Sequence, residues 1–228
     1  MDTVLETVLP AHPYYPATLA LPHYIANTLT FQQALGVLGA AILVIGTGAT
    51  VLLSRRPQLS TCERIVFIWF LVSGSIHLVL EGYFVLNHRT LAGDQRILGQ
   101  LWKEYSHSDS RYLSSDTFVL LMEAVTAIID GPLCYLAAFA IYQNSPFRHV
   151  VQLSVSIAQM YGDLLYYTTT LFEGFPHCNP HPYYFWFYFV FMNAVWIVIP
   201  FSLAWQSGKY LTSAVTRIQA LESRKKAH

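Results

Sequence analysis

Charged residues are scarce in this chain of 228 residues. They make up 11% of it, whereas hydrophobic residues make up 54%, and the mean hydropathy is +0.39. A soluble domain has about 25% charged residues, so this chain has too little polar surface for one. The 13 Lys and Arg residues only balance the 13 Asp and Glu residues, and nucleic-acid binding normally needs a basic excess. The composition predicts an all-α integral membrane protein with no nucleic-acid partner.

Cysteine is also rare, and no motif surrounds it. Cys62, Cys134 and Cys178 are odd in number, scattered and without C-x-x-C spacing, so neither a disulfide framework nor a zinc site is indicated. We expect no metal site. The first thirty residues lack the basic-then-apolar order of a cleaved signal peptide, so we expect the N-terminal segment to be retained.

Long apolar stretches are present instead, and each could cross a hydrocarbon core of about 30 Å as one helix. The sequence predicts five such spans, at about 31–53, 65–86, 117–141, 149–171 and 183–205. The fourth carries a stripe of polar residues at three- and four-residue intervals, among them Gln152, Gln159 and Asp163.

The segments outside these spans have distinct characters. Residues 1–30 contain four prolines that prevent regular helix, and they form an expected interfacial segment. The connection 87–116 either forms a short amphipathic helix near 94–105 or is a plain loop. Ser114, Ser115 or Asp116 can cap the next helix. Residues 206–228 form an expected basic cytosolic tail.

Five spans place the two termini on opposite sides, and the basic residues predict which side each takes. Nine Lys and Arg residues fall on the side of the C-terminus and four on the other, which favours a lumenal N-terminus and a cytosolic C-terminus. The final Lys225-Lys226-Ala227-His228 then reads as a dilysine retrieval signal for the endoplasmic reticulum, or equally as a basic stop-transfer end.

The second span contains two ionisable residues, His77 and Glu81, four positions apart. On a helix this spacing places both side chains on one face. An ionisable group at bilayer depth costs roughly 2.5–3.5 kcal/mol on insertion scales, so it should face the protein interior and serve a function there. A structural hydrogen bond between helices is the alternative.

Polar residues of the other spans share this depth. Under the predicted topology Glu81 and Glu123 both lie roughly 8–9 Å below the outer membrane edge, and Asp163 and Asn193 lie within one turn of them. Buried carboxyls repel each other, so we expect at least one glutamate to hold a proton at neutral pH. A protonated carboxylic acid beside a base allows general acid–base chemistry on an apolar molecule. Trp196 could stabilise a cation, or simply pack inside the bundle.

At these residues the sequence resembles the emopamil-binding protein family of sterol Δ8–Δ7 isomerases, in collinear order over nearly the whole chain. The matching stretches include His12-Pro13-Tyr14-Tyr15-Pro16, the run Ile76 to Leu86, Gln100 to Tyr105, Asp109 to Tyr112, Met122 to Ala127, Gly131-Pro132, Gln159 to Asp163, and Tyr184 to Asn193.

The resemblance implies an endoplasmic reticulum isomerase that needs no cofactor. It protonates the alkene at carbon 9, forms a cation at carbon 8 and removes a carbon 7 proton from a membrane sterol. Family members bind cationic amphiphilic amines and form homodimers. By the resemblance, the expected catalytic residues are His77, Glu81, Glu123, Asn193 and Trp196. The expected substrate-binding residues are Tyr112, Thr126, Asp130 and Asp163.

Two features depart from the family pattern. Asp130 replaces an apolar residue, and the His-Cys-Asn-Pro-His-Pro run at 177–182 is unusual. If Asp130 lines the pocket, a repurposed isoprenoid or terpenoid cyclase or isomerase is an alternative function. A non-catalytic sterol or amine binder is another, although the retained acids argue against it. A transporter would require inverted repeats with broken helices, and the sequence shows no such repeat.

Overall fold

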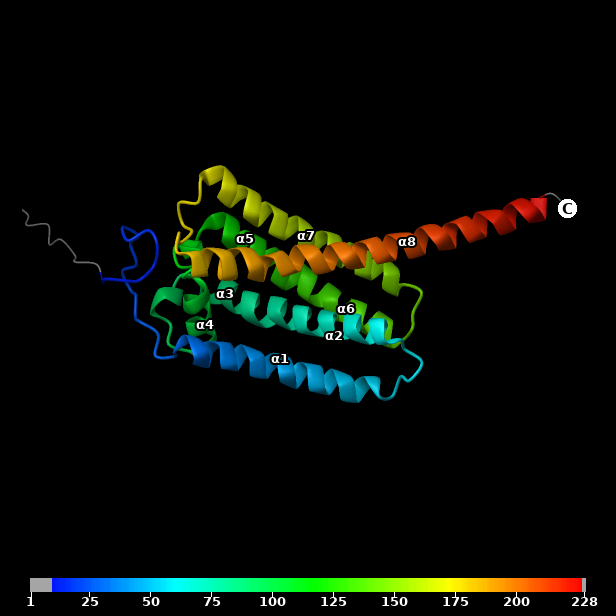
Figure 1. The fold of residues 1–228 in the computed structure, drawn as a ribbon, viewed down its shortest axis with the longest axis horizontal. Helices are drawn as coiled ribbons and strands as arrows, with labels where there is room; N and C mark the ends of the chain where they lie inside the picture. The colour runs from blue at the N-terminus through cyan, green and yellow to red at the C-terminus, as the bar shows by residue number, and fades with distance from the viewer. Residues whose placement is uncertain (1–9, 227–228) are drawn as a thin grey trace, which may run out of the picture.

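The computed structural model describes residues 10–226, and these residues form a bundle of long helices (Figure 1). Four helical stretches are long and apolar enough to cross a membrane: Phe31–Leu53, Thr61–Asn87, Thr117–Tyr142 and Tyr183–Lys226. The all-helical fold is thereby confirmed for the described residues, and these four stretches are candidate membrane spans by length and composition. The first of them is helix α1 (Phe31–Leu53), which begins at a capping box formed by Thr30 and Gln33.

The other three stretches each contain a π-helical segment. The second consists of α2 (Thr61–Ser75), η1 (Ile76–Glu81) and α3 (Gly82–Asn87). The third consists of α5 (Thr117–Val125), η4 (Thr126–Asp130) and α6 (Gly131–Tyr142), and the last of η5 (Tyr183–Met192) and α8 (Asn193–Lys226). In η1 and η4 the closing N–H groups, of Gly82 and Gly131, bond to carbonyls five residues back. Such segments are rare and occur frequently at functional sites.

Helix α7 (Arg148–Glu173) forms where the fourth span was expected, but it is not apolar enough to be counted with the four stretches. Its polar side chains explain this, because Gln152, Ser156 and Gln159 are buried against the other helices. Exposed apolar residues recur every seven positions on the outward face of α7. They are Val150, Ile157, Leu164 and Leu171. A helix with polar residues inside and apolar residues outside suits a lipid environment.

Two apolar cores lie at opposite ends of the bundle. One is built around Phe67, Phe70, Ala137, Ile141 and Val155. The other contains Tyr14, Phe84, Trp102, Tyr166 and Phe189. Along three of the long helices the ionisable residues lie between the residues of these cores. The polar groups are therefore enclosed from both ends.

The connection before α5 is ordered and forms one end of the bundle. It contains η2 (Leu91–Gly93), α4 (Ile97–Tyr105) and η3 (Ser110–Tyr112), and the expected short helix is α4. Over its described residues, 10–30, the proline-rich segment is not helical and packs on α4. Gln100 Oε1 accepts from the backbone N–H groups of Thr28 and Leu29, and Lys103 Nζ donates to Ile25 O over 2.8 Å. Asp116 is the predicted cap of α5, accepting from Val119 N at 2.9 Å.

Asp94 ties this connection to the second span. It accepts hydrogen bonds from the Tyr83 hydroxyl and from Arg96, whose Nε lies 3.0 Å from Oδ1. Burial alone raises the pKa of Asp94, but the bonds from Arg96 and Tyr83 outweigh it and lower the pKa from 3.8 to about 2. The ionised form is therefore stabilised by folding.

We expect the stabilisation from Asp94 to be present above about pH 4, the unfolded pKa, and lost as the pH falls towards 2. Its size should be on the order of 1 kcal/mol, since the Arg96 partner is largely exposed. The measurement is the melting temperature of the detergent-solubilised protein and of Asp94→Asn between pH 7 and pH 2. The difference between the two should shrink through this window, and a constant difference would contradict the assignment.

The C-terminal part of the chain continues α8 as far as Lys226, and the helix projects beyond the bundle (Figure 1). The basic segment 206–226 is thus helical and largely exposed. Ala227 and His228, which complete the predicted dilysine signal, lie outside the described residues.

Candidate active site

A cavity of about 450 Å³ opens among the helices, within the usual range for small-molecule sites. Apolar side chains form most of its wall, including Leu35 and Leu38 of α1 and Phe187 and Phe191 of η5. Eight of the nine predicted site residues also line it. They are His77, Glu81, Tyr112, Glu123, Thr126, Asp163, Asn193 and Trp196.

His77 and Glu81 are paired inside η1. Nδ1 of His77 lies 2.7 Å from both carboxylate oxygens of Glu81, and His77 is 2% exposed. The backbone around them is closely packed: a Cβ at Gly131 would lie 2.8 Å from Leu78 Cγ and 3.4 Å from His77 Cβ. Gly131 therefore allows η4 to approach η1, which brings the residues of the third span to this pair.

The other ring nitrogen of His77 faces Gln159 and Ser73. The amide Nε2 of Gln159 lies 2.9 Å from His77 Nε2 and donates to the Ser73 hydroxyl at 2.8 Å. With the Gln159 amide in this orientation, His77 Nε2 is the acceptor and Nδ1 carries the hydrogen that Glu81 accepts.

Thr126 connects the two glutamates. Its hydroxyl donates to Glu81 Oε2 and also lies 3.0 Å from the backbone carbonyl of Glu123. On the far side, the Tyr112 hydroxyl donates to Glu123 Oε1 at 2.7 Å, and Glu123 is 5% exposed. Each carboxyl therefore faces the cavity while a hydroxyl group holds it in place.

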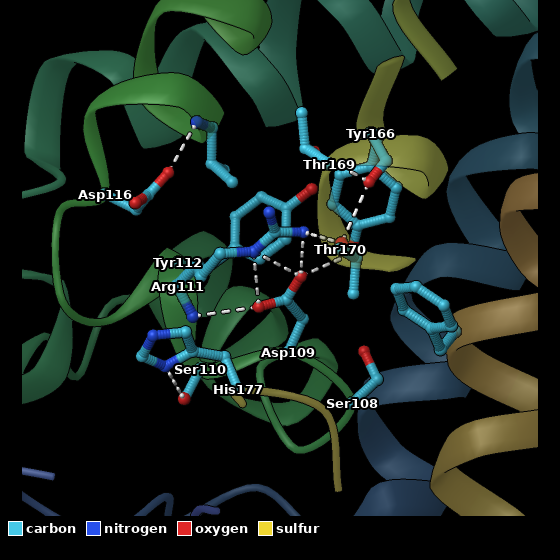
Figure 2. A network of polar contacts seen from close by, with 12 residues as sticks. Ser108, Asp109, Ser110, Arg111, Tyr112, Asp116, Tyr166, Thr169, Thr170 and His177 are labelled. Carbon is cyan, nitrogen blue, oxygen red and sulfur yellow. Dashed lines mark hydrogen bonds and ion pairs between the residues drawn. The ribbon is translucent and has the colours of Figure 1, made fainter. Parts of the chain in front are cut away.

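A buried ionic network holds Tyr112 (Figure 2). Arg111 and Asp109 are 2% and 0% exposed at their side chains, and their closest atoms are 2.6 Å apart. The Tyr166 hydroxyl donates to Asp109 Oδ2 at 2.8 Å, and Arg111 donates to Thr170 Oγ1 at 2.5 Å. These bonds fasten η3 to α7, and thereby fix the residue that contacts Glu123.

The same network includes the unusual 177–182 run. The backbone N–H of Ser110 donates to His177 O at 3.1 Å, and its hydroxyl lies 3.3 Å from His177 Nδ1 (Figure 2). Asp109 and Cys178 form an isolated antiparallel bridge. The segment before η5 thus packs on the connection beside the site.

Asn193 and Trp196 lie on α8 at the opposite wall. The Tyr105 hydroxyl donates to Asn193 Oδ1 at 2.8 Å, and Asn193 Nδ2 donates to Phe189 O at 2.7 Å. The Trp196 ring is 6.3 Å from the His77 ring, centroid to centroid, in an edge arrangement. Its indole Nε1 has no hydrogen-bond partner within residues 10–226. The ring is thus positioned by packing and borders the cavity.

The two aspartates differ in position. Asp163 lines the cavity, and its Oδ2 has no hydrogen-bond partner among the residues that the structure describes. Asp130 ends η4 and is 1% exposed, but it is not among the described residues that line the cavity. Its part in substrate binding stays a prediction.

Sequence reasoning missed several groups that support the site. Gln159 stood in the predicted polar stripe and in one matching stretch, but it was not predicted as a site residue; its place in a seven-residue inward repeat is the signal that would have found it. Ser73 precedes His77 by four residues, a spacing that indicates a shared helix face. The Asp109–Arg111 pair gave no such signal, because two residues of one loop can pair in many ways.

Comparison with known proteins places this chain in a family. A family model described as EXPERA (EXPanded EBP superfamily) matches residues 97–207. The chain is 46% identical over 213 residues to the 3-beta-hydroxysteroid-Delta(8),Delta(7)-isomerase of Rattus norvegicus, covering 91% of each protein. It is 47% identical over 214 residues to the corresponding isomerase of Mus musculus, covering 90% of this chain and 91% of the relative.

A more distant relative bears another name. The chain is 34% identical over 152 residues to an isomeliandiol synthase of Melia azedarach, covering 66% of this chain and 71% of that protein. The resemblance predicted from the sequence motifs is confirmed by the matches to the rodent isomerases. The chain therefore belongs to the EXPERA (EXPanded EBP superfamily) family.

Proposed function

We propose that this protein is a sterol Δ8–Δ7 isomerase, an enzyme that moves a double bond within ring B of a 3β-hydroxysteroid. One observation carries the proposal: the His77–Glu81–Thr126 and Tyr112–Glu123 contacts converge on a single cavity with mostly apolar walls. Such walls suit a sterol, and the two carboxyls supply an acid and a base. The names of the rodent relatives identify the same reaction.

In the proposed mechanism, one carboxyl carries a proton and the other is ionised. The alkene π electrons form a bond from carbon 9 to this proton, which leaves a cation at carbon 8. The ionised carboxylate then removes a proton from carbon 7, and the electron pair of that C–H bond forms the new double bond. One proton enters and one leaves, so the product is an isomer. Either glutamate can be the initial acid.

The surroundings assist both steps. Proton transfer by a positioned group contributes typically 10²–10⁴-fold, and the apolar wall strengthens electrostatic interactions with the cation. The Trp196 ring presents π electrons to that charge. After each turnover the proton rests on the other carboxyl and must return to the first one before the next turnover. His77, whose Nδ1 lies 2.7 Å from Glu81, is the proposed group that accepts or relays it. Thr126 orients Glu81 through its hydroxyl, whereas Asn193 bonds to Tyr105 and Phe189 and contributes a polar group to the cavity wall.

The proposed membrane arrangement has five spans with α7 as the fourth, a lumenal N-terminus and a cytosolic C-terminus, in the endoplasmic reticulum. The apolar outward face of α7 supports counting it as a membrane span, which brings the total to five. The distribution of Lys and Arg supports the orientation. In protease-treated microsomes a tag at the C-terminus should be cleaved and one at the N-terminus protected. The opposite pattern would reverse the orientation.

Cationic amphiphilic amines are the proposed inhibitors, since an ammonium group resembles the carbon 8 cation and would sit beside the same carboxyls. The homodimer that the resemblance implies stays a prediction.

The function is tested by giving the purified full-length protein a Δ8 sterol and analysing the products. We expect conversion to the Δ7 sterol without added cofactor, and rescue of a yeast strain that lacks sterol isomerase. Specific amine binding without conversion or rescue would favour the non-catalytic binder. Conversion of a polyprenyl substrate instead of the sterol, altered in Asp130→Leu, would favour the terpenoid alternative.

A further inference from the structure

A third glutamate lines the cavity at the end that α4 covers. Glu104 is part of the cavity wall, and the proposed proton transfers do not use it. The hydroxyl of Tyr188, a buried residue of η5, donates to Glu104 Oε1 at 3.1 Å. Among residues 10–226 no Lys, Arg or His forms an ion pair with this carboxylate. Glu104 thus retains hydrogen-bonding capacity toward the cavity.

Two hydrogen bonds from neighbouring residues fix the part of α4 that carries Glu104. Trp102 Nε1, two residues earlier on α4, donates to Leu80 O at 2.8 Å, next to Glu81. Tyr105, the following residue, bonds to Asn193 at 2.8 Å. Glu104 therefore lines the same cavity as Glu81 and Glu123, on a helix whose position is fixed by contacts with η1 and α8.

A sterol in this cavity needs such a group. Its 3-hydroxyl lies roughly 6 Å from carbon 9, since four carbon–carbon bonds and one carbon–oxygen bond of about 1.5 Å separate them. An alcohol that leaves water without a hydrogen-bond partner costs about 1–3 kcal/mol. A carboxylate has about four acceptor positions, of which Tyr188 occupies one. The apolar walls from α1 and η5 suit the remainder of the molecule.

Resting on the proposed function, we propose that Glu104, oriented by Tyr188, is the subsite that accepts a hydrogen bond from the 3β-hydroxyl of the substrate. The subsite sets the register of the ring system, so that ring B lies at Glu81 and Glu123. Its ligand class is a sterol alcohol, as opposed to a sterol ester, ether or hydrocarbon. Asp163 is the competing candidate, because it also lines the cavity and lacks a partner for Oδ2 within the described residues.

The experiment compares two substrates in detergent micelles, a Δ8 3β-hydroxysterol and the same sterol without the 3-hydroxyl. Glu104→Leu should raise KM for the hydroxysterol about tenfold, the value of one hydrogen bond to a charged group, and leave KM for the deoxysterol within twofold. Glu104→Gln, which keeps a neutral acceptor, should show a smaller selective rise. Glu173→Gln, an exposed carboxyl outside the cavity, should change neither constant.

The comparison separates the subsite from a structural role. Damage to the fold, or loss of the packing around Tyr188, would raise KM equally for the hydroxysterol and the deoxysterol. Equal rises for both substrates in Glu104→Leu and in Glu104→Gln would therefore overturn the proposal. A selective KM rise in Asp163→Asn, with none in the Glu104 variants, would overturn it in favour of Asp163. If the unaltered protein isomerises neither sterol, the proposed function itself fails. That outcome differs from one in which the unaltered protein is active and the Glu104 variants change KM equally for both sterols.

Discussion

Glu123→Gln and Glu81→Gln should each lower kcat for double-bond migration by about 10³-fold. Gln matches Glu in shape and can still accept a hydrogen bond, so the contacts from Tyr112 to Glu123 and from His77 to Glu81 can persist. What the amide cannot do is deliver or accept the proton. The loss should therefore fall on turnover, with expression and melting temperature near those of the unaltered protein.

The measurement is the initial rate of Δ7 sterol formation by purified variants. Glu222→Gln provides a matched control, because this glutamate is exposed on the projecting part of α8. Full activity in either site variant would remove that residue from the acid–base role. Binding of a cationic amine should also weaken in both, since each variant removes a charge partner of the ammonium; unchanged affinity would contradict the cation-mimic idea.

The spacing of ionisable residues was enough to predict which of them would line one cavity. A histidine and a glutamate four apart in an apolar span share a face, and lipid exposure would be costly for both. The common depth of Glu123, Asp163 and Asn193 followed from the topology, and the structure places all three on the cavity. Their placement on one cavity was predictable because the cost of burying charge in a membrane leaves few positions open, whereas their chemical roles stay predictions.

The π segments could not be predicted in the same way. The runs that form η1 and η4 read as ordinary apolar helix, because α- and π-helical turns use the same residue types and differ only in hydrogen-bond register. Close packing decides the register, as at Gly131, where a larger residue would collide with Leu78. Asp130 shows the same limit: helix periodicity placed it on the face of Glu123, yet it is not part of the cavity wall that the structure describes.

Tertiary contacts also decided the connection before α5. A short helix there was one of two alternatives, and its amphipathic pattern did not reveal that Trp102 and Lys103 would be buried. Lys103 became buried by donating to Ile25 O, which depends on the path of the N-terminal segment. The sequence of α4 contains no trace of that path.

Asp109→Asn should reduce the stability of the protein by about 3–5 kcal/mol, because it leaves the Arg111 guanidinium buried without a counter-charge. Burial alone lowers the pKa of Arg111, and in the unaltered protein Asp109 more than offsets this effect. The variant loses that support, but a guanidinium is not deprotonated in proteins, so the charge of Arg111 remains and is unpaired. Tyr166 also loses a charged acceptor. A fall in melting temperature and loss of the monodisperse peak in detergent gel filtration would report the effect.

A second ion pair gives the matched comparison. Arg148 and Glu63 are 2.5 Å apart, much like Arg111 and Asp109, but their side chains are 17% and 28% exposed. Glu63→Gln should therefore cost no more than about 1 kcal/mol.

The double variant Asp109→Leu with Arg111→Met should recover much of the stability lost in Asp109→Asn, since apolar residues can replace a buried pair at little cost. It should nevertheless turn over slowly, because the Arg111 bond to Thr170 that fastens η3 beside Tyr112 is gone. Equal losses in Asp109→Asn and Glu63→Gln would show that burial does not set the strength of the network that holds Tyr112 against Glu123.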